Sequence, residues 1–141
     1  MQPLPKNLLV CAAFAAVTIA IAYPAIAHHS TTMFNHASVV TISGTVREVH
    51  WTNPHVAIFV FGSVKAGEEP VMWVLEMTSP GNLTRAGGWS RTAIKPGDKV
   101  EVTMAPLRDG NKGGALKKIT VAERGLTLNA DIRDQEGTIK E

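Results

Sequence analysis

Short segments in which apolar side chains occupy every second position dominate the chain, and turn-forming residues separate them. Between residues 99 and 104, for example, Val100, Val102 and Met104 alternate with polar residues. This period of two is typical of β-strands that place one face against a core. The segment 56–61 is apolar at every position, which is typical of a central strand covered on both faces. The sequence therefore predicts five strands, at residues 39–49, 56–61, 71–77, 99–104 and 116–121.

The segments between these strands predict how the chain is connected. Ser79-Pro80 can cap and open a short helix, because proline suits the first helical position, and the glycines from Gly87 onward end it. Residues 95–98 read Lys-Pro-Gly-Asp, which is a signal for a type II turn. Within the first strand, Gly44 predicts a bulge or a sharp bend.

The resulting order is strand, strand, strand, short helix, strand, strand, which is the order of the five-stranded OB-fold barrel. A glycine in the first strand fits this fold, because that strand must bend to serve both sides of a small barrel. We therefore expect an all-β domain, mainly β with one short helix, that forms an OB-like barrel. An open β-sandwich built from the same hairpins is the alternative.

The first 27 residues have the features of a secretory signal peptide. Lys6 supplies a positive charge, residues 8–21 are apolar, and Ala25-Ile26-Ala27 matches the small-residue cleavage signal. The apolar run is shorter than the roughly 20 residues that span a bilayer, so cleavage after Ala27 is favoured over a retained anchor. We therefore expect export to the periplasm and a mature chain that begins at residue 28 and does not span the membrane.

Cleavage leaves one domain of ordinary size without cysteine, because Cys11 is the only cysteine and lies in the leader. The mature chain can therefore use no disulfide, cysteine nucleophile or thiolate ligand. Loss of Lys6 lowers the formal net charge from +2 to +1, and a near-neutral chain is a poor candidate for nucleic-acid binding. We expect the barrel at residues 28–121 and a polar tail at 122–141, with a short edge strand near 126–128.

All five histidines lie between His28 and His55. After cleavage His28 offers an α-amine and an imidazole on one residue, and imidazole is the commonest protein metal ligand. His50 and His55 bracket the turn at residues 51–54, and across a tight hairpin opposed Cβ atoms lie about 4.5–5.5 Å apart. The sequence therefore predicts a metal site of His28, His50 and His55, with His36 as a fourth candidate.

A nitrogen-rich site of this kind suits Cu(II), which stands at the top of the divalent affinity series. Zinc is the alternative ion, since it also accepts nitrogen ligands. We expect a binding, delivery or accessory role rather than an enzymatic one, because no spacing indicates a catalytic triad; an oxygen-activating copper enzyme is the less favoured variant. A histidine-rich arm that holds no fixed metal is the competing interpretation.

A metal-free binding module is the alternative function. The barrel face that carries Trp51, Phe59 and Trp73 would then hold a small ligand or a periplasmic protein partner, as OB-folds bind oligosaccharides and oligonucleotides through such faces. Glu76 points away from the core side of the third strand. It either forms an ion pair there or accepts a hydrogen bond from a metal-binding histidine.

Several short motifs occur in order along the chain. They are Ala27-His28-His29-Ser30, residues 51–55 (Trp-Thr-Asn-Pro-His), Ser79-Pro80 followed by Leu83, Arg85, Gly88 and Trp89, residues 95–98 (Lys-Pro-Gly-Asp), and residues 106–110 (Pro-Leu-Arg-Asp-Gly). The set resembles a family of small exported bacterial proteins known only as a domain of unknown function, over nearly all of residues 27–121. The resemblance implies export and one small β-rich domain, and it implies no activity, cofactor or catalytic residue.

Overall fold

The structure, a computed structural model, describes residues 33–130. The predicted signal peptide, His28 and the end of the predicted tail lie outside these residues. The elements of the described part are β1 (Val40–His50), β2 (Ala57–Ser63), β3 (Val71–Glu76), α2 (Pro80–Ala86), β4 (Lys99–Pro106), β5 (Gly113–Val121), the 3-10 helix η2 (Ala122–Arg124) and β6 (Leu126–Asn129).

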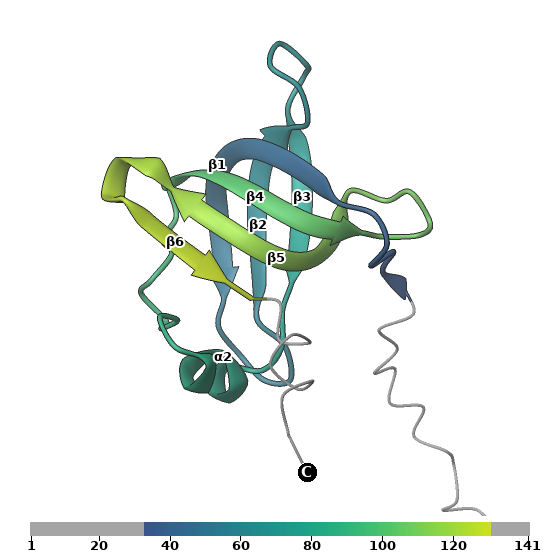
Figure 1. Cartoon of the computed structure of the whole chain (residues 1–141). Coiled ribbons are helices and arrows are strands. Elements are labelled where there is room, and N and C mark those ends of the chain that lie inside the picture. The colour runs from purple at the N-terminus through teal and green to yellow at the C-terminus, as the bar shows by residue number, and fades with distance from the viewer. Residues whose placement is uncertain (1–32, 131–141) are drawn as a thin grey trace, which may run out of the picture. The chain divides into compact units, whose positions relative to one another are not determined.

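The strands form a single sheet that closes on itself into a barrel (Figure 1). β1 pairs antiparallel with both β2 and β4, β2 pairs with β3, and β4 pairs with β5. The barrel closes where β3 and β5 run parallel, with Val74 opposite Gly113 and Glu76 opposite Ala115. The predicted five-stranded OB-like barrel is therefore confirmed, and the open sandwich is excluded because β3 and β5 are hydrogen-bonded to each other.

Each of the five barrel strands contributes at least one fully buried side chain to the core. Ile42, Ile58, Leu75, Val102 and Ile119 each have 0% exposure. Burial of apolar surface stabilises a fold by roughly 25 cal/mol per Å². The two-residue period of the sequence is therefore explained by strands that turn alternate side chains into this core.

The short helix α2 lies at one end of the barrel (Figure 1). The Ser79 side chain accepts a hydrogen bond from the backbone N–H of Asn82 at 3.3 Å, and Pro80 occupies the first turn. Leu83, with 0% exposure, is the buried residue of the helix. Gly87, at φ 95°, follows its last residue. The predicted start and end of the helix are thus confirmed, and the helix contributes one apolar side chain to the core.

Of the two alternatives predicted for Gly44, a bulge or a sharp bend, the bulge is wrong, because the register shift in β1 lies between Val46 and Glu48. At Gly44 the strand β1 pairs with both β2 and β4. Gly44 pairs with Gly62, and a Cβ on Gly44 would lie only 2.5 Å from the carbonyl oxygen of Phe61. The missing side chain therefore allows two backbones to approach closely.

The sheet continues past the boundary predicted at Val121. β6 pairs antiparallel with β5, so the predicted edge strand is present. Leu128 and Ala130 are buried, and the indole Nε1 of Trp89 donates a hydrogen bond to the carbonyl oxygen of Asn129 at 2.7 Å. The folded domain therefore extends at least to Ala130, because these residues complete the core that the five barrel strands begin.

Candidate functional site

The histidines that bracket the first hairpin are not directly opposed. β1 ends at His50 and β2 begins at Ala57, and these two residues are register partners. His55 lies in the connection of residues 51–56, just before Val56, whose N–H bonds to the carbonyl oxygen of Thr78 at 3.1 Å. The hairpin is therefore present, but the assumption that His50 and His55 face each other across a tight turn is wrong, because the connection is longer than that turn.

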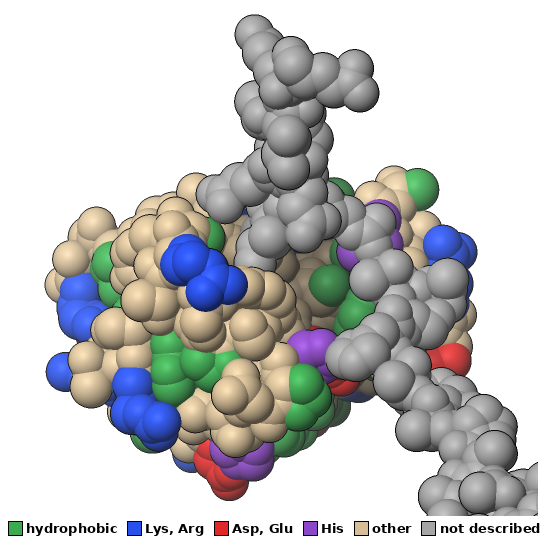
Figure 2. All heavy atoms as spheres, turned by 90° about the horizontal axis from the view of Figure 1, so that it is seen from below, with side chains coloured by type: hydrophobic (Ala, Val, Ile, Leu, Met, Phe, Trp, Pro, Cys, Tyr) green, Lys and Arg blue, Asp and Glu red, His purple; other side chains and the backbone are tan. Residues whose placement is uncertain are grey.

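The imidazole of His50 is held by two neighbours. Its Nε2 lies 2.9 Å from a carboxylate oxygen of Glu48, and its ring centroid lies 4.8 Å from that of Phe59. Its side chain remains 53% exposed. On the side of the molecule seen in Figure 2, histidine side chains lie beside acidic side chains, with hydrophobic side chains exposed nearby. His50 is therefore oriented but accessible.

The other predicted ligands lie elsewhere. The ring of His36 packs edge-on against Phe34, with centroids 6.1 Å apart, and Phe34 forms an isolated β-bridge with Leu107. His28 lies outside the described residues. Within residues 33–130 no group of three or more His, Cys, Asp or Glu side chains is placed to hold a metal ion. Of the four predicted ligands, the structure therefore describes His36, His50 and His55.

A second candidate site is an apolar surface on the outside of β1, β2 and β3. Along β2, Ile58 and Val60 are buried in the core, whereas the residues between them point outward and are only half-buried. The prediction that this strand is covered on both faces is therefore wrong for the described part of the chain. We call this surface the outer face; it consists of Arg47, Glu48 and His50 on β1, Ala57, Phe59 and Phe61 on β2, and Met72, Val74 and Glu76 on β3.

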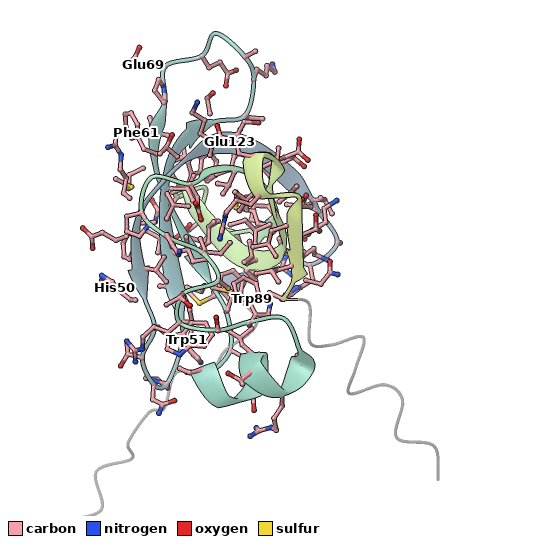
Figure 3. The ribbon with its side chains drawn as sticks, turned by 90° about the vertical axis from the view of Figure 1, so that its left-hand side faces the viewer. His50, Trp51, Phe61, Glu69, Trp89 and Glu123 are labelled. Carbon is pink, nitrogen blue, oxygen red and sulfur yellow. The ribbon has the colours of Figure 1, made fainter. Side chains whose placement is uncertain are left out.

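Two side chains of β1 hold the phenyl rings of the outer face. The guanidinium carbon of Arg47 lies 5.2 Å from the ring centroid of Phe61, a cation–π distance, and His50 packs against Phe59. Met72, the register partner of Phe61, is 44% exposed. Phe61 and His50 lie along the same side of the sheet in Figure 3. The phenyl rings at the centre of the outer face are therefore held by neighbouring side chains of the same molecule.

The tryptophans do not belong to this surface, which corrects the predicted face of Trp51, Phe59 and Trp73. Trp73 is 6% exposed, and its Nε1 donates a hydrogen bond to the carbonyl oxygen of Gly62 at 3.1 Å. Trp51 packs against the core, and in Figure 3 it lies with Trp89 toward the α2 end of the barrel. Only Phe59 of the predicted set is on the outer face, because alternate residues of a strand point to opposite faces.

The outer face has unpaired charges at two of its corners. Glu48 contacts His50, but within residues 33–130 the guanidinium of Arg47 and the carboxylate of Glu76 have no hydrogen bond or ion pair. Glu76 is half-buried on β3, at the row of Ala57. Neither of the two alternatives predicted for Glu76, an ion pair or a hydrogen bond to a histidine, occurs among the described residues.

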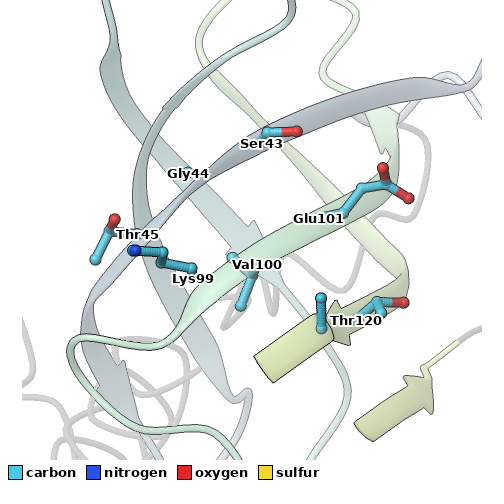
Figure 4. A pocket seen from close by; sticks show the side chains of 8 residues that line it. Ser43, Gly44, Thr45, Lys99, Val100, Glu101 and Thr120 are labelled. Atoms are coloured by element: carbon cyan, nitrogen blue, oxygen red, sulfur yellow. The ribbon is translucent and has the colours of Figure 1, made fainter. Parts of the chain in front are cut away.

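A shallow groove of about 530 Å³ lies on the wall formed by β1, β4 and β5 (Figure 4). Its lining includes the hydroxyls of Ser43, Thr45 and Thr120 and the charged side chains of Lys99 and Glu101. The two charged residues stand two positions apart on β4 and are exposed to solvent. The groove therefore combines hydroxyl and charged side chains with apolar ones, Val100 and Ala122 among them.

Comparisons place the chain among known proteins. Two crystal forms of the mitochondrial single-stranded DNA binding protein Rim1 from S. cerevisiae match it with 10% and 12% identity and TM-scores of 0.44 and 0.41, covering 60% and 65% of this chain and 93% and 97% of Rim1. No curated protein matches the chain. In the described part no helix is long and apolar enough to cross a membrane. The model of the family of unknown function DUF6152 matches residues 16–117, so the chain belongs to that family, as the motifs in its sequence indicate.

Proposed function

We propose that this protein is a binding module and that the outer face is its binding surface. The observation that carries the proposal is the half-burial of Phe59 and Phe61 and the 44% exposure of Met72 on one face of the barrel. Aromatic, Met and Arg side chains, which meet on this face, are enriched in protein interfaces. The same face of strands, with its neighbouring loops, is the one through which OB-folds bind their ligands.

A photoreactive residue in place of Met72 tests this surface in the cells that produce the protein. Lys118 is the matched control, because it is exposed on β5, away from the outer face. We expect a covalent adduct of defined mass from position 72 and none from position 118. The proposal is refuted when neither position gives an adduct, or when both positions give the same products.

We also propose, as a second candidate, that the exported chain binds copper through His28, His50 and His55, with His36 as a further ligand and zinc as the alternative ion. The position of the chain near Phe34 favours this candidate. Phe34 pairs with Leu107, whose N–H bonds to the carbonyl oxygen of Gly113 at 3.0 Å; Gly113 is opposite Val74, which in turn is opposite Phe59. Phe34 therefore stands at the start of a row of paired residues that ends at Phe59. The ring of His50 packs against the ring of Phe59.

The amine and imidazole of His28 would supply two nitrogen ligands, and His50 would keep its Nδ1 available while Nε2 contacts Glu48. Cu(II) bound in this way is held by nitrogen ligands that it prefers.

Two measurements test the copper site and the export on which it depends. Mass spectrometry of the protein from the periplasm should find an amino terminus at His28; a different terminus removes the amine chelate. In Cu(II) titrations, His28→Ala and His55→Ala should each weaken binding at least about ten-fold, the order reported for disturbed metal sites. His29→Ala is the matched control and should change little. Equal affinities in all four proteins would rule out the proposed ligands.

A further inference from the structure

The outer face has a charge pattern that identifies its occupant more closely, and the inference rests on the binding surface proposed above. Its centre is apolar, with Phe59 in the middle row and the middle strand. Arg47 lies in the bulge of β1 and its guanidinium lies beside the ring of Phe61, toward one corner, whereas Glu76 stands at the diagonally opposite corner on β3, in the row of Ala57. One unpaired positive charge and one unpaired negative charge thus lie on opposite sides of an apolar centre, whereas the third charged residue, Glu48, contacts His50.

These two charges cannot satisfy each other within one molecule. Two strand spacings across the sheet and two to four residues along it place Arg47 and Glu76 roughly 12–16 Å apart, far beyond ion-pair distance. Neither has another hydrogen-bond or ion-pair partner within residues 33–130. Both charges are therefore available to charged groups of opposite sign on a molecule that covers the outer face.

We propose that the occupant of the outer face is a second copy of this chain, related to the first by a two-fold axis. The axis lies in the interface, passes close to Phe59 and runs perpendicular to the line from Arg47 to Glu76. Arg47 of each copy then lies over Glu76 of the other, and both ion pairs form at once, as an isologous interface requires. A partner with a patch of uniform charge would satisfy one corner and repel the other.

The packing of the apolar centre agrees with this arrangement. An axis perpendicular to that diagonal makes the strands of the two sheets cross at roughly a right angle, which is one of the two ways in which sheets pack face to face. The Phe59 rings of the two copies meet near the axis, where aromatic pairs add to the stability of an interface. Arg47 and His50 contact the rings of Phe61 and Phe59 within one copy, so little ordering is needed on association.

The size of the outer face predicts a weak dimer. It spans roughly 14 Å across three strands and 17 Å along five residues, which is smaller than the roughly 800 Å² per partner of a stable complex. We therefore expect a monomer–dimer equilibrium with a dissociation constant on the order of tens to hundreds of micromolar. The dimer is thus populated only where the protein is concentrated.

Sedimentation analysis of the protein recovered from producing cells, at concentrations up to about 1 mM, tests the inference by charge reversal. Arg47→Glu and Glu76→Arg should each weaken dimerisation at least about ten-fold, since each places like charges over one another. The double variant should return to within about three-fold of the original affinity, because both ion pairs form again with reversed polarity. Lys118→Glu, on β5 away from the outer face, is the control and should have no effect.

The results separate this inference from the binding surface on which it rests. A protein that stays monomeric throughout, or a dimer insensitive to both charge reversals, overturns the second copy as occupant. An adduct from position 72 whose mass is not twice that of the chain does the same, while it leaves the outer face as a binding surface. Far-ultraviolet circular dichroism confirms that each variant is folded, and Glu76→Arg alone decides the outcome where Arg47→Glu unfolds the protein.

Discussion

Replacing Leu83 by alanine tests whether α2 is an integral part of the barrel core. Leu83 is fully buried and is the buried side chain of a helix that covers one end of the barrel. Removal of a buried leucine side chain costs 2–5 kcal/mol, depending on how far the site can collapse. Because α2 is short and lies at the end of the barrel, partial collapse is feasible, and we expect a loss of about 3 kcal/mol.

Urea unfolding followed by tryptophan fluorescence measures this loss, since Trp51 and Trp89 lie toward the α2 end of the barrel (Figure 3). With an m-value near 1.5 kcal/mol per M, a loss of about 3 kcal/mol lowers the unfolding midpoint by about 2 M. Arg85→Ala, on the exposed side of the same helix, is the matched control and should stay within about 0.5 kcal/mol. A loss below about 1 kcal/mol for Leu83→Ala would show that α2 is not packed as described.

Three further substitutions have effects of predictable sign in the same unfolding assay. Gly44→Ala should destabilise the protein by about 2 kcal/mol, because the new Cβ meets the backbone carbonyl of Phe61; Gly81→Ala, in α2 with its nearest atom at 3.6 Å, should instead be neutral or stabilise by up to about 1 kcal/mol. The same sign for both would refute the steric argument. Trp89→Phe removes the hydrogen bond to the carbonyl oxygen of Asn129 and should cost about 1–3 kcal/mol; an unchanged midpoint would mean that this bond does not hold β6.

The architecture was predictable from the sequence because the signals that specify it are local. A core on one side of each strand produces the two-residue period, which is visible without knowledge of any partner strand. The helix was predictable for a similar reason, since Ser79 and Pro80 open it and Gly87 ends it. The position of the bulge was not predictable: it lies after Val46, where the register with β2 shifts, and not at Gly44.

The candidate surface depended on register, which the sequence does not reveal. The run from Val56 to Phe61 fits a strand covered on both faces, and only the folded structure distinguishes it from one whose second face is accessible. The contacts of Arg47 with Phe61 and of His50 with Phe59 depend on the pairing of β1 with β2. A slip of one residue would turn these side chains to the other face.

The parallel pairing of β3 with β5 also determines when the protein can fold. It joins residues near Val74 to residues near Gly113, and the barrel closes through this pairing. Contacts between residues so distant in sequence form slowly, because a long loop must be ordered before they are made. Without β5 the preceding strands can form only an incomplete sheet, in which the edge of β3 that pairs with β5 is unpaired. A chain that stops before Gly113 should therefore remain unfolded and be open to proteases or to association with other strands, whereas one that extends through β6 should fold as a unit.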